Sequence, residues 1–210
     1  MKQYLFIILI VLISGCCSYD QKDFDFSKDE LNHFSVYNIG DTIYFESNLG
    51  DMDTITIVDF KTVKHENCRG IIAHKPMNGK WISIKHLPVD QWHGTTQDMT
   101  KNGKIEIDYA TLFWISKFPT DTETIYNIEF KDFYTASDTA IGEFHADTIP
   151  LNNLKISRYY LVKHGYPERI TEPQNIATIY WTDQYGLTAY KSKAGETWTI
   201  RKSTNHKVLH

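Results

Sequence analysis

The stretch TIYFESNLGDMDTITIVD, residues 42–59, places two β-prone runs on either side of a short turn signal. Residues 42–48 and 53–59 are rich in β-branched and aromatic side chains, which favour strands, and the segment 49–52 contains the glycine of a turn. Helical spacing of apolar residues is nearly absent here and along most of the chain. We therefore predict an antiparallel hairpin over residues 42–59.

Similar runs recur along the rest of the chain toward its C-terminus. We predict further strands at residues 69–74, 80–86, 104–110, 124–134, 155–163, 176–182, 185–190 and 196–200. Asn78 and Gly79 tolerate positive φ and predict a hairpin turn before residue 80, and the segment 193–195 predicts another before residue 196. About ten short strands at close spacing imply a mainly β fold with little helix, either an antiparallel sandwich or a full or partial β-barrel.

The chain begins with a segment that is typical of a secretory signal. One lysine precedes an apolar run over residues 4–13, about half of the roughly 20 residues that a membrane-spanning helix needs. The sequence Ile13-Ser14-Gly15-Cys16 resembles a bacterial lipobox. The resemblance implies that signal peptidase II recognises Ile13, Ser14 and Gly15, removes residues 1–15, and leaves Cys16 acylated, so that the protein is anchored to a membrane without crossing it. The alternative is an ordinary secretory signal.

The chain after the signal is predicted to have three parts. Residues 16–33 hold the lipidated cysteine and an acidic stretch with few apolar side chains, which predicts a solvated tether. Ser27 and Glu30 have the spacing of a capping box, so a short helix begins there. Residues 34–203 form a single β-rich domain, and 204–210 form a tail. The acidic stretch also resembles the export signal of Bacteroidetes-type lipoproteins, which implies the outer membrane, on its periplasmic or surface face.

Charge and cysteine content narrow the classes of function. The chain carries 22 basic and 26 acidic residues, and removal of the signal changes the formal net charge from −4 to −5 because only Lys2 is lost. Nucleic-acid binding needs a basic patch or stripe, so we expect none. Cys17 and Cys68 could pair in an oxidising envelope, but we expect Cys68 to be free because Cys17 lies in the tether.

The closing segment carries a second resemblance. Residues 179–187 (IYWTDQYGL), followed by Tyr190 and by 195–200 (GETWTI), are similar to the end of small Bacteroidetes-type lipoproteins of unknown function. The pattern is more distantly similar to half-barrel lipoprotein carriers, in which a curved sheet holds an apolar ligand. The resemblance implies an envelope address and a β fold, and it supplies no catalytic residue. Alternation in the last strand places Trp198 and Ile200 on one face, which we expect to be the core face.

Candidate catalytic and metal-binding residues are few. His65, Cys68 and His74 are residue types that bind Zn²⁺, but their spacing is not that of a closed zinc site, so we predict no metal and no cofactor. Cys68 beside a histidine could act as a nucleophile. Asp90 and His93 share a loop and place a carboxylate near an imidazole. These residues define an alternative function, an envelope hydrolase, although no nucleophile elbow or phosphate-binding loop accompanies them.

Aromatic residues in the second half of the chain are the candidate ligand-facing residues. Consecutive strand residues point to opposite faces, so one ring of each aromatic pair faces outward or into a cavity. The four candidates are Tyr160, Tyr180, Trp181 and Tyr185. One interpretation is a stacking platform for a sugar or an apolar ligand; the other is that the rings fill the core.

The sequence thus predicts a lipid-anchored lipoprotein of a bacterial cell envelope with a non-enzymatic binding or accessory role. The expected partners are the membrane, reached through the lipid anchor, and a small apolar or glycan ligand or another envelope protein. A hydrolase and a purely structural lipoprotein remain as alternatives. A deep pocket that holds Asp90 and His93 in contact would favour the first, and a filled barrel would favour the second.

Overall fold

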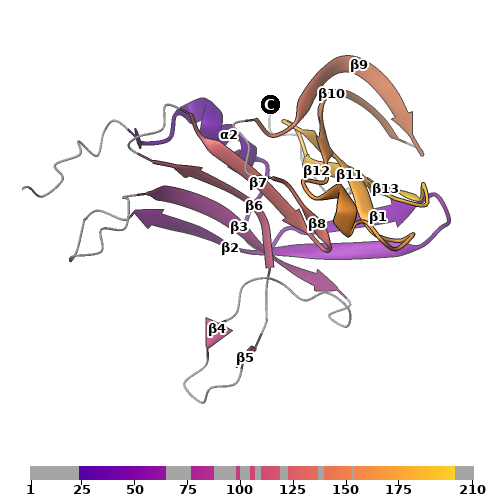
Figure 1. Cartoon of the computed structure of the whole chain (residues 1–210), viewed down its shortest axis with the longest axis horizontal. Helices are drawn as coiled ribbons and strands as arrows, with labels where there is room; N and C mark the ends of the chain where they lie inside the picture. Colours follow the sequence, from indigo (N-terminus) through magenta and orange to yellow (C-terminus); the bar gives the residue numbers. More distant parts are fainter. Residues whose placement is uncertain are drawn as a thin grey trace, which may run out of the picture.

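The described residues form a curled sheet of eleven antiparallel strands that makes a half-barrel, accompanied by one α-helix (Figure 1). The computed structural model describes residues 24–64, 77–87, 98–99, 105–106, 110–118, 123–136, 140–152 and 154–201. The predicted mainly β fold is confirmed, in the form of a partial barrel. The signal segment, Cys16, Cys68, Asp90 and His93 lie outside the described residues, as does the 204–210 tail.

Most strands that are neighbours in the large sheet are also neighbours in the chain. They are β1 (Thr42–Ser47), β2 (Met52–Lys64), β3 (Asn78–Leu87), β4 (Asp98–Met99), β5 (Ile105–Glu106), β6 (Ala110–Lys117), β7 (Ile125–Phe130), β8 (Phe133–Tyr134), β9 (Glu143–Leu151), β10 (Leu154–Lys163), β11 (Ile176–Thr182), β12 (Gly186–Ser192) and β13 (Thr197–Ile200), with helix α2 (Lys28–Ser35) and the short 3₁₀ helix η2 (Pro167–Arg169). The large sheet has the order β8-β7-β6-β3-β2-β1-β13-β12-β11-β10-β9, and β4 pairs with β5 separately.

Most of the predicted strands are present, the one at residues 69–74 lies outside the described residues, and the predicted Asn78-Gly79 turn is wrong. The hairpin of β1 and β2 is confirmed, as are β10, β11, β12 and β13. Asn78 instead begins β3 and pairs with Lys64 at the end of β2. Its side-chain amide donates to the carbonyl oxygen of Phe24 (2.9 Å) and to Asp25 (3.2 Å). Asn78 therefore fixes the N-terminal segment against the sheet rather than turning the chain. Strand β9 and most of β6 were not predicted.

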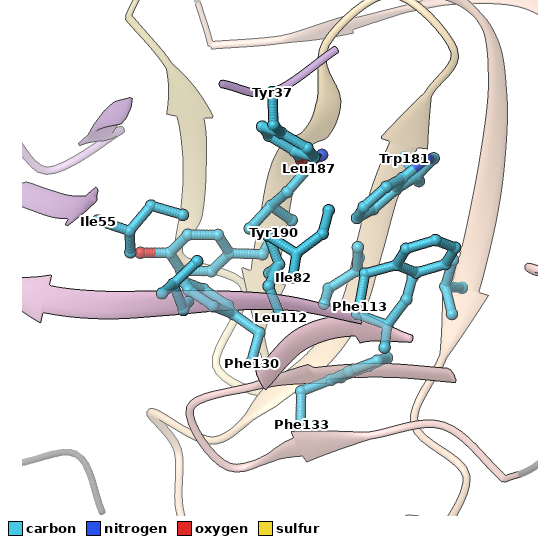
Figure 2. Packing of buried hydrophobic residues seen from close by; sticks show 14 of the residues in the cluster. Tyr37, Ile55, Ile82, Leu112, Phe113, Phe130, Phe133, Trp181, Leu187 and Tyr190 are labelled. Carbon is cyan, nitrogen blue, oxygen red and sulfur yellow. The ribbon is translucent and has the colours of Figure 1, made fainter. Parts of the chain in front are cut away.

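The concave side of the half-barrel is filled by apolar side chains (Figure 2). The largest fully buried ones are Phe45, Ile55, Ile57, Ile82, Ile84, Leu112, Phe113, Ile115, Phe130, Phe133, Trp181 and Tyr190. Alternation explains the inward direction, since Phe45 on β1 and Ile55 and Ile57 on β2 point to one face. Aromatic rings interlock across this core, with Phe113 lying 4.9 Å from Trp181 between ring centroids. The described residues thus make the concave side a packed core.

The segment before β1 packs on the sheet over much of the range expected to be a tether. The capping box is confirmed, because Ser27 accepts a hydrogen bond from the Glu30 backbone and the Glu30 carboxylate accepts one from the Ser27 backbone. Glu30 also pairs with Lys117 (3.3 Å). Phe24 is only 3% exposed. Residues 24–33 are therefore attached to the body of the protein through Phe24 and Glu30, while Asp25, Ser27, Lys28, Asp29 and Asn32 remain exposed.

A contact between Tyr37 and the start of β12 joins the segment before β1 to the second half of the sheet. The Leu187 backbone amide donates to the Tyr37 hydroxyl (2.7 Å). Gly186 has φ +66°, and a Cβ atom at this position would lie 2.0 Å from the Tyr37 hydroxyl oxygen. Only glycine meets both requirements, the left-handed backbone and the close approach.

The hairpin of β9 and β10 curls away from the rest of the sheet (Figure 1). Its register shifts at a bulge between Ser157 and Tyr159, where Arg158 has φ +53°. The curl brings the hairpin tip back to β13, and the Asn152 side-chain amide donates to the Thr197 carbonyl oxygen (2.7 Å). Ile156 and Tyr159 of this hairpin are buried outside the main core cluster. The hairpin therefore adds a second, smaller packed region.

Candidate functional site

A groove lies where the tip of the β9–β10 hairpin approaches β1 and β13. Its volume is ≈ 940 Å³. The lining residues are Glu46, Ser47, Asn48, Leu49, Gly50, Asn152, Leu154, Lys155, Thr199, Ile200 and Arg201. They come from the end of β1 and its turn, from the hairpin tip, and from the end of β13. The groove exists because the bulged hairpin bends back over the sheet.

Main-chain and side-chain hydrogen bonds fix the walls of this groove. Glu46 and Thr199 are direct partners across β1 and β13, so their side chains share a face. The Thr197 backbone amide donates to the Asn48 side-chain oxygen (3.0 Å), and its carbonyl oxygen accepts from Asn152. Both asparagines thus attach their loops to the start of β13. The groove is built from braced segments rather than from free loop ends.

The lining combines charged, amide and aliphatic groups. Lys155 and Arg201 supply cationic donors, and Glu46 supplies an acceptor. Leu49, which is 72% exposed, and Leu154 supply apolar surface. Such a surface can hydrogen-bond hydroxyl or carboxylate groups while contacting the carbon skeleton of a ligand. The part of the lining that the structure describes contains no aromatic ring.

The four candidate aromatic residues do not form one platform. Trp181 is 0% exposed and lies in the core, so its assignment as a ligand-facing residue is wrong. Tyr160 pairs with Trp181 across β10 and β11 and is only partly buried. Tyr180 is half-buried and packs on Tyr159, 5.8 Å between ring centroids. Tyr185 is half-buried in the β11–β12 turn. The packing of Trp181 favours the interpretation that such rings fill the core.

Trp198 was expected to lie on the core face of β13, but it is less buried than its neighbours on the other face. It is half-buried, stacked on Tyr190 at 5.7 Å between centroids, while Thr197 and Thr199 on the opposite face are buried. The simple contrast between a core face and a solvent face fails for β13. The reason is that the curled hairpin reaches β13 through Asn152, so the second face of this strand is covered as well.

A buried polar cluster centred on Asp53 lies inside the half-barrel. The Asp53 carboxylate, in a side chain only 4% exposed, accepts hydrogen bonds from His86 Nε2, from the Tyr190 hydroxyl and from Lys131 Nζ. Lys131 also donates to the Tyr190 hydroxyl (3.3 Å). These residues come from β2, from β3, from the turn between β7 and β8, and from β12. One carboxylate therefore connects strands from both halves of the sheet.

The cluster shifts the proton affinities of its members. Burial alone would raise the pKa of Asp53, but the hydrogen bond from His86 and the charge of Lys131 outweigh it, so the pKa lies well below its usual range. Burial, followed by the nearby Asp53 charge, raises the pKa of Tyr190. Asp53 is thus ionised and Tyr190 neutral near neutral pH. The sequence contained a signal for this cluster, because alternation places Asp53 on the same face as Ile55 and Ile57.

His33 on α2 occupies an aromatic environment at another point of the core. The Phe113, Tyr126 and Tyr160 rings surround it edge-on, with centroids 5.9–6.1 Å away. Its Nδ1 atom lies 3.6 Å from an Asp183 carboxylate oxygen. Burial lowers the pKa of His33 below the usual value of about 6.5, and Asp183 offsets this only in part. Protonation of His33 therefore opposes the docked position of α2.

We expect this effect to appear as a pH-dependent stability difference. A lowered folded-state pKa means that the unfolded chain binds more protons, so the contribution of His33 is fully present above about pH 6.5 and is lost as the pH falls toward the folded-state pKa. In His33→Phe, which keeps a ring at this position, that loss is absent. Urea unfolding of both proteins at pH 8, 7, 6 and 5 measures the difference. A difference that stays constant over this range contradicts the assignment.

The described residues contain neither a metal-binding cluster nor a membrane-spanning helix. Within them, no group of three or more histidine, cysteine, aspartate or glutamate side chains could hold a metal ion. No helix in this part of the chain is long and apolar enough to cross a membrane.

The described chain thus defines an antiparallel half-barrel with a packed concave side and a polar groove at the tip of its curled hairpin. Comparisons of the sequence and structure with protein-family models, with curated proteins and with solved structures gave no match.

Proposed function

We propose that this protein is a lipid-anchored lipoprotein of the bacterial cell envelope, on the outer membrane, and that it binds a glycan in the groove beside the β9–β10 hairpin. The observation that carries the binding proposal is the groove itself, ≈ 940 Å³ in volume and lined by charged, amide and aliphatic side chains. The lipobox at residues 13–16 supports the anchor. Catalysis is not part of the proposal.

The chemistry of the lining favours a hydroxyl-rich ligand. Glu46, Lys155 and Arg201 offer acceptors and donors for hydroxyl or carboxylate groups of a sugar chain. Leu49 and Leu154 offer aliphatic surface for its carbon skeleton. An apolar ligand inside the half-barrel has less support, since side chains such as Phe113 and Trp181 occupy the concave side of the described domain.

A glycan array probed with the full chain in detergent tests the binding proposal. We expect Lys155→Ala and Arg201→Ala each to weaken binding to the glycans that the wild type retains, because each removes a charged donor from the groove. Lys163→Ala is the matched control, since Lys163 is an exposed lysine at the other end of β10 and outside the groove lining. Binding that is unchanged in both groove variants, or lost equally in the control, contradicts the proposal.

The anchor is tested independently. We expect Cys16→Ser to prevent lipidation, because without the thiol no thioether to the lipid forms, and to move the protein from the membrane fraction to the soluble envelope fraction. Labelling with radioactive palmitate and membrane fractionation measure both effects. A variant that stays in the membrane and still incorporates palmitate contradicts the lipobox interpretation.

The packed concave side favours a second candidate, a purely structural lipoprotein without a small ligand. A core that includes Phe45, Phe130 and Tyr190 at or near zero exposure supports it. The two candidates differ in the glycan experiment, since a structural lipoprotein gives no glycan signal that depends on Lys155 or Arg201. Deletion of the gene followed by measurement of detergent sensitivity of the cells would then support the structural role.

A further inference from the structure

The ammonium group of Lys131 sits among three aromatic rings and one carboxylate. Its Nζ atom lies 5.5 Å from the ring centroid of Phe130, 5.1 Å from that of Tyr190 and 5.5 Å from that of Trp198. Asp53 supplies the carboxylate. Rings within about 6 Å attract a cation through their quadrupoles, and aromatic cages bind ammonium ligands in this way. We call the set of Asp53, Phe130, Tyr190 and Trp198, without Lys131, the Asp53 cage. It has the chemistry of a site for ammonium groups.

The shape of the Asp53 cage does not depend on Lys131. Asp53 also accepts hydrogen bonds from His86 and Tyr190, which hold its carboxylate in place. The Phe130 and Tyr190 rings are buried in the core, 5.1 Å apart between centroids, and Tyr190 stacks on Trp198. If the Lys131 side chain leaves, the rings and the buried negative charge remain, and that charge favours another cation.

The Lys131 side chain lies where it can move out of the Asp53 cage into solvent. It lies in the turn between β7 and β8, and its side chain is 25% exposed, in contrast to 4% for Asp53. Its backbone has φ +55°, a left-handed conformation that is unfavourable for a residue other than glycine. The side chain thus enters the Asp53 cage from the solvent side, on a backbone that the ion pair helps to hold.

We propose that the Asp53 cage is a binding site for alkylammonium groups of external ligands, and that Lys131 is an internal competitor that fills it when no ligand is bound. An amine-bearing ligand enters when the Lys131 side chain swings out into solvent. The site is separate from the groove lining, and the inference does not rest on the proposed glycan function.

The first test opens the Asp53 cage with Lys131→Gly, which removes the competitor and suits the positive φ. The full chain in detergent is titrated with n-butylammonium chloride, whose four-carbon chain and ammonium group match the removed side chain. We expect saturable binding by calorimetry and a rise in the thermal midpoint. Neutral n-butanol, and sodium chloride at the same ionic strength, should give neither effect.

Lys131→Met is the matched control, because its apolar chain fills the Asp53 cage without a charge and should leave the protein insensitive to n-butylammonium. Adding Trp198→Leu to the Lys131→Gly protein should weaken binding several-fold, since one ring of the cage is lost. Equal responses of Lys131→Gly to n-butylammonium and n-butanol, or no response of the folded variant, would overturn the proposal.

The wild type provides a measurement that does not depend on the folding of any variant. The rings should shift the Lys131 ε-methylene proton resonances upfield, and n-butylammonium should move them toward the position of free lysine as it displaces the side chain. We expect this to need at least about tenfold more ligand than Lys131→Gly, because the site is open for only a fraction of the time. Resonances that do not move at saturating n-butylammonium would overturn the proposal.

Discussion

Asp53→Asn is expected to lower the free energy of unfolding by about 3–5 kcal/mol, the usual cost of breaking a buried ion pair by removing one partner. The substitution keeps the shape of the side chain but removes its charge, so the Lys131 ammonium loses its counterion and the Tyr190 hydroxyl loses a charged acceptor. Urea unfolding at pH 7, followed by far-ultraviolet circular dichroism, measures the change.

The control for Asp53→Asn is Asp51→Asn, which makes the same chemical change two residues earlier at an exposed position. We expect a change in the free energy of unfolding within about 0.5 kcal/mol there.

The pH dependence of the stability gives a second check on Asp53. Because the pKa of Asp53 is lowered in the folded state, its contribution is fully present above about pH 3.9 and is lost as the pH falls below that value. The stability difference between wild type and Asp53→Asn should therefore narrow in acid, and a difference that is as large at pH 2 as at pH 7 contradicts the ion-pair account.

Trp181→Ala is expected to cost about 3–5 kcal/mol, as large-to-small substitutions of buried aromatic residues do. The side chain is fully buried and lies between Tyr37 and Phe113, with ring centroids 6.1 Å and 4.9 Å away. Because it joins the N-terminal segment to β6 and β11, its loss leaves a cavity that neither wall can fill alone. The midpoint of urea unfolding, at unchanged m-value, measures the loss.

Trp181→Phe is the matched comparison. It keeps a ring in the core, and it removes the buried Trp181 Nε1 group, which has no hydrogen-bond partner among the described residues. We expect less than half of the loss seen with Ala. If both variants keep wild-type stability while losing ligand binding, Trp181 is a recognition residue after all, and the core assignment is wrong.

The sequence predicted the fold class because its strands carry their own local signals. The run at residues 42–59 combines β-branched residues with a glycine turn, and β1 and β2 pair there as expected. Strand β9 was missed because its sequence EFHADTIPL is charged and contains Pro150, which is unusual inside a sheet but is accommodated on an edge strand. The prediction of a turn at Asn78 and Gly79 was wrong because the Asn78 side chain contacts Phe24, which is distant in sequence, and this contact overrides the local turn preference.

The candidate site was less predictable than the fold. The groove depends on the bend at Arg158, and no local pattern shows that a non-glycine residue will adopt positive φ there. Lys131 and Tyr190 are about 60 residues apart in the chain, so only the rolled sheet brings them to Asp53. The inward position of Asp53 was readable from strand alternation, but its three partners were not.

The strand order has a consequence for how the protein folds. The first strand, β1, pairs with the last, β13, near the middle of the sheet, and this contact joins the β2–β8 half to the β9–β12 half. Contacts between the two ends of a chain form slowly, because the entropy of closing the loop is lost before the contacts stabilise it. A chain that leaves the ribosome with its N-terminus first therefore cannot complete this sheet until β13 has been synthesised. Until then β1 has an unpaired edge, which can pair wrongly with a strand of another chain.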